Sequence, residues 1–263
     1  MIITGAASGI GRAVAELAAE TLEEAHLFLL DRDELGLEET MAAVVKHGAK
    51  VDIAGVDLAD VQATQAVTRQ GLDRLGGLDS LISNAGILRA VSLLDIDVAS
   101  FDAMFDINTR ATWVLAKAAH AALARSRGSV VATASISSVQ PSPGLGTYGP
   151  SKAALVMLVQ QMAVEWGRDG IRCNCVSPGP TFTGMTAKTF NDENDPKHLE
   201  NRHLRESFLP LAKIGTPREV AQAILFLAGP ASSQITGVNL NVDGGQSLAL
   251  MKATGGGSGH KAG

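Results

Sequence analysis

The sequence contains two side chains that together could relay a proton, Tyr148 and Lys152. They lie four positions apart, so a helix would place both on one face. A lone tyrosine has a pKa near ~10 and exchanges protons poorly at neutral pH, whereas an adjacent ammonium favours the phenolate and lowers that pKa. The same spacing is common on ordinary amphipathic helices, so the pair indicates catalysis only if suitable groups accompany it.

Further polar residues stand at positions where a reacting oxygen would need them. Ser135 ends a predicted strand, 13 residues before Tyr148, and could hydrogen-bond a substrate oxygen. Asn108 lies in a long predicted helix, 27 residues before Ser135. Thr147 could cap the helix that carries Tyr148, and Pro150 is tolerated only in a first turn, which places the helix start here. Each residue alone has a structural explanation, but the set in this order rarely arises by chance.

A glycine-rich segment, residues 4–11, joins the first predicted strand to the first predicted helix. Its glycines permit a tight turn and a close approach of the backbone to a ligand. The helix that follows offers free N–H groups and a positive dipole to a pyrophosphate. Such a loop can also be an ordinary connection between a strand and a helix, but its place after the first strand favours a dinucleotide site. The candidate contacts in this loop are Gly5, Ser8, Gly9, Ile10 and Gly11.

An acidic residue follows this loop at the distance expected for a dinucleotide site. Asp31 comes 20 residues after Gly11, where a carboxylate can accept both ribose hydroxyls of an adenosine. It favours NAD over NADP, because a carboxylate would repel a 2′-phosphate. Arg32 complicates this choice, since it could pair with that phosphate or lie flat over the adenine. Ligands bind outside the carboxyl ends of the strands, which adds the candidates Asp57, Leu58, Asn84, Ala85 and Gly86.

The elements that must position these residues alternate between strand and helix along the chain. Strands are predicted over 2–4, 26–30, 51–56, 78–83, 129–134, 171–176 and 238–242, and helices over about 9–20, 33–46, 60–74, 100–126, 148–167 and 216–228. This alternation predicts a doubly wound α/β fold, a single Rossmann-like domain over 1–250 with a parallel seven-stranded sheet. The first strand is unusually short. The glycine- and serine-rich end, 251–263, reads as a flexible tail or an artificial remnant.

Composition narrows the class of protein further. The net charge of −5 gives no reason to expect a nucleic-acid or anionic-membrane partner. No apolar run approaches the ~20 residues of a membrane span, and no signal region precedes the glycine loop. Cys173 and Cys175 read as small core side chains, which suits a reducing, cytoplasmic compartment. His198 and His203 have no accompanying metal ligands, so we expect no metal site.

Taken together, these motifs resemble the short-chain dehydrogenase/reductase family over nearly the whole chain. The resemblance also covers Asn174-x-x-x-Pro178-Gly179 and a closing Asp243-Gly244-Gly245. It implies a tetrad in which Tyr148 is the general acid/base, Ser135 positions the substrate oxygen, Lys152 lowers the tyrosine pKa and holds the nicotinamide ribose, and Asn108 supports a relaying water. It further implies a dimer or tetramer, and cofactor contacts from Tyr148, Lys152, Pro178, Gly179, Thr181 and Thr183.

The expected activity is interconversion of a secondary alcohol and a ketone with NAD or NADH. By the same resemblance, the irregular, charged segment 180–210 is a substrate lid, and plausible pocket residues are Ser137, Gln140, Leu145 and Met185. Two alternatives are a reductase of 3-oxoacyl groups on a carrier protein, which usually favours NADPH, and a silent dinucleotide sensor on the same fold. The intact tetrad argues against the sensor, and Asp31 opposes NADPH.

Overall fold

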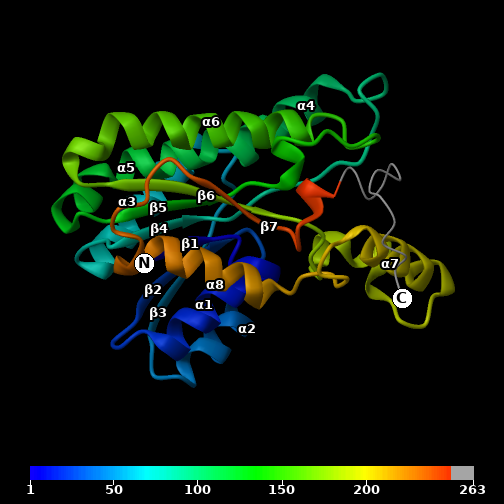
Figure 1. Ribbon diagram of the computed structural model, residues 1–263. Coiled ribbons are helices and arrows are strands. Elements are labelled where there is room, and N and C mark those ends of the chain that lie inside the picture. Colours follow the sequence, from blue (N-terminus) through cyan, green and yellow to red (C-terminus); the bar gives the residue numbers. More distant parts are fainter. Residues whose placement is uncertain (250–263) are drawn as a thin grey trace.

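The structure is a computed structural model that describes residues 1–249. Its centre is a sheet of seven parallel strands in the order β3-β2-β1-β4-β5-β6-β7 (Figure 1). The strands are β1 (Ile2–Thr4), β2 (His26–Asp31), β3 (Lys50–Gly55), β4 (Ser80–Ser83), β5 (Ser129–Thr133), β6 (Arg172–Pro178) and β7 (Asn239–Val242). The predicted parallel seven-stranded, single-domain fold is therefore confirmed. The tail predicted over 251–263 lies outside the described residues.

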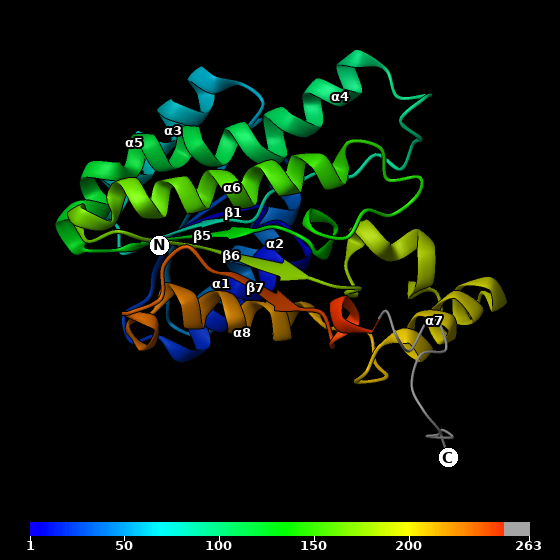
Figure 2. The same cartoon turned by 45° about the horizontal axis from the view of Figure 1, so that its top comes forward.

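Helices cover both faces of this sheet (Figures 1 and 2). Those on the faces are α1 (Gly9–Thr21), α2 (Glu34–Val45), α3 (Val61–Leu75), α5 (Ala111–Ser126), α6 (Tyr148–Trp166) and α8 (Pro217–Ala228). The chain also forms α4 (Val98–Phe105) and α7 (Pro196–Phe208), and α7 lies beside the sheet rather than on either face. Helices α1, α2 and α8 share one apolar core, to which Val14 and Val220 contribute. Helices α3, α5 and α6 share a second core on the other face, with Leu115 and Leu155. The sheet therefore lies between these two cores.

The short first strand is real, and its position explains why three residues suffice. β1 lies in the middle of the sheet and pairs in parallel with β2 on one side and β4 on the other. Ile2 and Ile3 point to opposite faces, and each is completely buried in a different core. Backbone pairing on both sides and burial on both faces hold the strand in place.

The helix predicted over 100–126 is interrupted, so that expectation was wrong in its middle. α4 ends at Phe105, a π-helical turn spans Asp106–Arg110, and α5 begins at Ala111. Asn108 lies in this turn, and its side chain bonds outside the helix. Single π-turns inside α-helices are frequently found at functional sites. Hydrophobic periodicity alone does not reveal one extra residue in a turn.

The segment 180–210, expected to be irregular, holds a helix, which corrects that expectation. A 3₁₀ turn (Gly184–Thr186) and a π-helix (Ala187–Asn191) precede α7. Asp195 starts α7 by accepting a hydrogen bond from Lys197 N (2.8 Å), with Pro196 in the first position. No residue of α7 is buried. Most of its side chains are charged or polar, which is why its sequence resembles a loop.

The same segment contributes a small apolar core of its own. Phe190, Leu209 and Ile214 are buried together, and Phe182 packs against them with its ring edge-on to Phe190. Arg202 of α7 lies over the Phe182 ring, 4.9 Å from its centroid. Within residues 1–249, no helix combines the length and the apolar character that crossing a bilayer requires.

Candidate functional site

The predicted site residues gather at the carboxyl edge of the sheet. β1 and β4 are neighbours there, yet the chain leaves β1 for α1 on one face and leaves β4 for α4 and α5 on the other (Figure 1). This divergence is a topological switch point, where open parallel sheets bind their ligands. The loops after β1, β4, β5 and β6 surround it.

Two residues of the glycine loop have backbone conformations that glycine adopts far more easily than other residues. Gly5 and Gly9 have φ of +67° and +55°, in the left-handed region. A Cβ on Gly11 would lie 2.1 Å from Gly5 O, so the first turn of α1 rests directly on the loop. Within residues 1–249, the side chain of Ser8 makes no capping bond at the start of α1. The first amides of α1 can therefore receive an anionic phosphate.

The loop after β4 clamps the glycine loop from the other side. Thr4 Oγ1 accepts hydrogen bonds from Asn84 N and Ala85 N, both at 3.0 Å. Asn84 Nδ2 donates to Thr4 O (3.3 Å) and Gly5 O (3.4 Å), while its Oδ1 accepts from Thr133 Oγ1 (2.9 Å). Both polar atoms of the Asn84 side chain are thus hydrogen-bonded within the protein, and they hold the glycine loop in place. Contact of Asn84 or Ala85 with a nucleotide stays a prediction.

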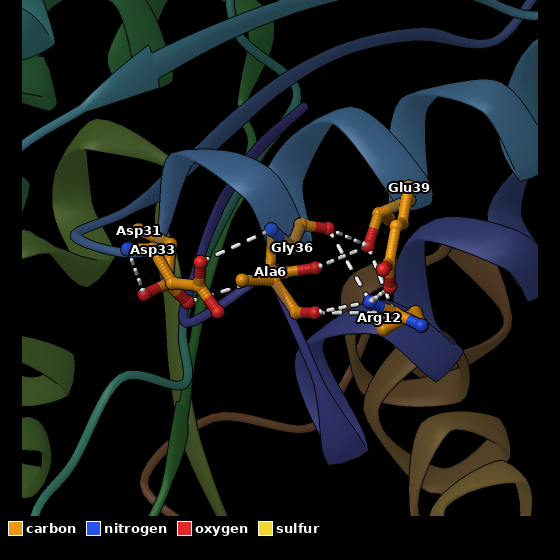
Figure 3. A network of polar contacts seen from close by, with 8 residues as sticks. Ala6, Arg12, Asp31, Asp33, Gly36 and Glu39 are labelled. Carbon is orange, nitrogen blue, oxygen red and sulfur yellow. Dashed lines mark hydrogen bonds and ion pairs between the residues drawn. The ribbon is translucent and has the colours of Figure 1, made fainter.

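Asp31 lies at the end of β2, beside the glycine loop, as predicted. Its Oδ2 accepts a hydrogen bond from Ala7 N (3.0 Å), and its Oδ1 accepts from Arg32 N (2.7 Å) and Asp33 N (3.2 Å) (Figure 3). A carboxylate has about four acceptor positions, so these bonds leave about one for a ribose hydroxyl. Arg32 is exposed and follows directly.

The loop after β3 contributes less than the sequence suggests. Asp57 is exposed, and its carboxylate accepts a hydrogen bond from Ala59 N (2.9 Å) in a local turn. The Leu58 side chain is buried in the core that α3, α5 and α6 share. A contact of Leu58 with a cofactor would therefore use its backbone.

Tyr148 begins α6 and faces Ser135. A Cβ on Gly149 would lie 2.9 Å from Ser137 O, so the first turn of α6 rests on the turn after Ser135. Tyr148 is only 9% exposed, and burial raises its pKa above 10.0, opposed by a hydrogen bond with Ser135. The expected lowering of this pKa is not found in the protein alone, because desolvation dominates. Thr147 does not cap α6 either, since its hydroxyl contacts Met104 Sδ.

Lys152 is a buried cation one turn further along α6. Its side chain is 3% exposed, and Nζ donates a hydrogen bond to Thr133 O (2.8 Å). Burial lowers its pKa from 10.5 to about 8, and the Cys175 thiol opposes this. A Cβ on Gly86 would lie 3.1 Å from Lys152 Nζ and from Asn108 Oδ1, so both atoms face Gly86. The structure therefore brings Gly86, Asn108 and Lys152 together.

Asn108 fixes the geometry around these groups through its side chain. Its Oδ1 accepts a hydrogen bond from Ile87 N (2.8 Å), and its Nδ2 donates to Ile87 O (3.0 Å) and Ser151 Oγ (3.0 Å). These bonds tie the π-turn to the loop after β4 and to α6. The expected water relay would have to use the Asn108 backbone, because the side chain is already engaged.

The segment that follows β6 reaches the glycine loop. A Cβ on Gly179 would lie 2.8 Å from Asp243 Cα, which explains why a glycine follows Pro178. Thr181 is buried and bridges to Gly215. A Cβ on Gly9 would lie 3.5 Å from the Thr183 side chain, so Thr183 lies beside the glycine loop. The resemblance placed this threonine near the nicotinamide end of the cofactor, and that contact stays a prediction.

The predicted substrate residues differ from one another in their contacts and in their exposure. Gln140 Nε2 donates a hydrogen bond to Ser247 O (2.7 Å), joining the segment after Ser135 to the segment after β7. Ser137 and Leu145 are half-buried, whereas Met185 is 49% exposed. Their contact with a substrate stays a prediction. His198 accepts a hydrogen bond from Asp192 N through Nδ1 (3.2 Å), which gives it a structural role.

Three residues that organise the site were missed from the sequence. Thr4 and Thr133 supply the oxygens that hold Asn84, Ala85 and Lys152. Arg12 follows Gly11 and bonds to the backbone of the glycine loop. The strand-end position of both threonines was a usable signal, whereas nothing local distinguishes Arg12 from a surface arginine of an amphipathic helix.

Known proteins resemble this chain over nearly its whole length. Residues 5–247 match the family model described as enoyl-(acyl carrier protein) reductase. The chain is 34% identical to 2-(S)-hydroxypropyl-CoM dehydrogenase 3 of Xanthobacter autotrophicus (92% of this chain, 94% of the relative). It is 33% identical to a 3-oxoacyl-[acyl-carrier-protein] reductase of Chlamydia muridarum (93% and 95%). A short-chain type dehydrogenase/reductase from Mycobacterium marinum superposes with a TM-score of 0.83 at 32% identity (93% and 94%).

The buried cation gives a stability prediction. The Lys152 pKa is about 8 in the folded protein against 10.5 ordinarily, so the unfolded chain binds more protons between these values. The wild-type free energy of unfolding should therefore gain up to about 3 kcal/mol from this group as pH rises through the window. Lys152→Met lacks that gain, which urea unfolding at pH 7 and pH 10 would measure. An identical pH dependence in both proteins would contradict the lowered pKa.

Proposed function

The chain belongs to the short-chain dehydrogenase/reductase family, and we propose that it is a NAD-dependent oxidoreductase that interconverts a secondary alcohol and a ketone. One observation carries the proposal. The buried Tyr148 hydroxyl shares a hydrogen bond with Ser135, and Nζ of the buried Lys152 lies 6.0 Å from the centroid of the Tyr148 ring. The glycine loop, whose following amides could receive a phosphate, lies at the same edge of the sheet. This arrangement supplies a proton donor, an oxygen ligand and a cation in one site.

The residues present fit a dinucleotide. Gly5 and Gly9 give the loop its left-handed turns, the first amides of α1 are not capped by the Ser8 side chain in the described part of the chain and could receive a phosphate, and Asp31 keeps acceptor capacity for the adenosine ribose. Lys152 has no carboxylate partner within residues 1–249, so its ammonium can donate to a ribose hydroxyl. When bound, the nicotinamide supplies the hydride acceptor or donor at C4.

The proton moves through Tyr148. In the oxidative direction the substrate carbon loses a hydride, and its hydroxyl proton passes to the Tyr148 phenolate. Ser135 hydrogen-bonds the same oxygen and holds it at Tyr148. The Lys152 ammonium favours the phenolate before transfer. In the reductive direction Tyr148 donates its proton to the oxygen that becomes the alcohol.

A second candidate is reduction of 3-oxoacyl thioesters on a carrier protein. The relative from Chlamydia muridarum favours it, and Asp31 opposes the NADPH preference that usually accompanies it. A panel of secondary alcohols, ketones and a 3-oxoacyl thioester, each tested with NAD, NADH, NADP and NADPH, separates the two candidates. Tight binding of NAD without turnover of any compound would support the sensor hypothesis instead.

We also propose that the protein is a cytoplasmic homo-oligomer and that residues 180–210 form a lid over the substrate. The two buried, free cysteines suit a reducing compartment. Outward-facing apolar side chains on α5 and α6 suit a partner copy: Trp113 is 41% exposed, Met157 64% and Val164 79%. Two such helices from each of two copies would form a four-helix interface.

Replacing the tyrosine tests the chemistry. Tyr148→Phe removes only the ionisable hydroxyl, so turnover should fall by about 10²–10⁴-fold while NADH affinity changes little. Steady-state rates and NADH fluorescence titration measure the two quantities. Alcohol oxidation by the unmodified protein should also accelerate at alkaline pH, because it needs the phenolate. Near-normal turnover of Tyr148→Phe would show that another group transfers the proton.

Coenzyme choice tests the role of Asp31. A hydrogen bond from the ribose 2′-hydroxyl to this carboxylate is worth about 1.5–3 kcal/mol, and the 2′-phosphate of NADP would instead be repelled. NAD should therefore be preferred at least about tenfold in kcat/KM. Asp31→Ser should relax or reverse that preference, with Arg32 free to pair with the phosphate. Asp73→Ser removes an exposed carboxylate on α3, away from this network; it is the matched control and should leave the preference unchanged.

The opposite result would be equally clear. If the unmodified protein used NAD and NADP equally well, Asp31 would not contact the ribose.

The assembly prediction concerns the face of α5 and α6. Light scattering at micromolar concentration should show a dimer or tetramer. Val164→Asp should shift that assembly toward smaller species, since a charge would be buried in the interface. Leu35→Asp changes a comparably exposed leucine on α2 and should leave the mass unchanged. A stable wild-type monomer would refute the interface.

A further inference from the structure

One arginine connects three parts of the nucleotide side of the site. Arg12, in the first turn of α1, donates from Nε and Nη2 to Ala7 O (3.1 and 2.6 Å). Nη2 also donates to Gly36 O (3.3 Å) and to the Glu39 carboxylate (2.8 Å), and Nε to Thr40 Oγ1 (3.0 Å). Figure 3 shows the Arg12 side chain, which comes from α1, beside Gly36 and Glu39 of α2. A single planar guanidinium therefore links α1, the glycine loop and α2.

The glycine loop is held on two sides at the same residue. The carbonyl of Ala7 accepts from Arg12, and the amide of Ala7 donates to Asp31 Oδ2 (3.0 Å). The neighbouring carbonyl, Ala6 O, accepts from Thr40 Oγ1 (2.9 Å). Ala7 thus joins Arg12 directly to the carboxylate that we expect to select the coenzyme. A shift of the Ala7 peptide would move or release that carboxylate.

Close backbone packing makes this coupling stiff. A Cβ on Gly36 would lie 2.8 Å from Ala7 Cβ and 2.9 Å from Ala7 O, so α2 rests on Ala7 and leaves no room for a side chain at position 36. Asp33 caps α2 by accepting from Gly36 N (3.1 Å), and Asp33 N donates to Asp31. The segment from Asp31 to Gly36 therefore takes its position from its contact with Ala7.

The contacts of Arg12 differ in strength. Glu39 is 70% exposed at its side chain, and an exposed ion pair contributes little because solvent screens it. The bonds to Ala7 O and Gly36 O are charge-assisted and lie at the less exposed end of the network. Thr40 is completely buried. The carbonyl bonds, more than the ion pair, should carry the effect.

We propose that Arg12 is a positioning residue that sets NAD affinity and coenzyme preference through Ala7 and Asp31, without a role in the chemical step. The inference rests on the proposed use of NAD. Losing the guanidinium removes the donors that fix Ala7 and loosens the pocket that receives the adenosine. Substrate chemistry at Tyr148 lies at the other end of the site and does not depend on this link.

The test compares variants of the full-length protein. Arg12→Met keeps the aliphatic stem and removes the donors, so the Kd and KM for NAD should rise about tenfold or more, with kcat at saturating NAD unchanged within about threefold. The ratio of kcat/KM for NAD to that for NADP should fall. Arg12→Lys should be intermediate, because one ammonium cannot reach both α2 and the loop as the fork does. Glu39→Gln should behave like the wild type.

Two further variants keep the test decisive. Arg218→Met removes the exposed ion pair with Glu20 and should change neither affinity nor preference. If Arg12→Met does not fold, as thermal unfolding would show, Thr40→Val removes the hydroxyl that bonds Ala6 O and should shift the coenzyme ratio in the same direction. Wild-type NAD affinity and preference in a folded Arg12→Met or Thr40→Val protein would overturn the inference alone. Failure of the unmodified protein to bind NAD would overturn the proposed function, and this inference with it.

Discussion

The site depends on a contact between two backbones that no side chain separates. The loop after β1 and the loop after β4 meet where their strands end, and a Cβ on Gly5 would lie 2.9 Å from Ala85 Cα. Asn84 closes this contact by donating from its backbone N to Thr4 Oγ1 and from Nδ2 to Thr4 O. Because both strands are central and buried on both faces, the contact is set by the core of the protein. The phosphate cradle on one side and the Lys152 pocket on the other take their positions from it.

Burial shifts the pKa values of the two candidate acid–base residues in opposite directions. It raises the pKa of Tyr148 and lowers that of Lys152, so each group is pushed toward its neutral form. The protein alone therefore holds a proton on the phenol. In the mechanism that we propose, the positive charge of an oxidised nicotinamide would oppose this preference and favour the phenolate. The desolvated site strengthens that electrostatic effect.

Much of the fold and site could be predicted from the sequence, because strand alternation and the glycine loop are local patterns with direct physical causes. The seven strands and the grouping of Ser135, Tyr148 and Lys152 follow from such patterns. The π-turn at Asn108 could not be predicted, since it exists through bonds to Ile87 and Ser151, far away in the chain. α7 was missed because it buries no face. The role of Arg12 depends on α2, whose position only the tertiary structure defines.

The central claim is that Tyr148 exchanges the proton and that the cofactor prepares it. Tyr148 is the single tyrosine of the chain, so the ultraviolet difference absorbance of tyrosinate reports this residue directly. A pH titration of the protein alone should give a pKa above 10.0, as burial requires. The same titration with saturating NAD⁺ should give a pKa lower by several units. A tyrosine that titrates above 10.0 in both cases would contradict the account.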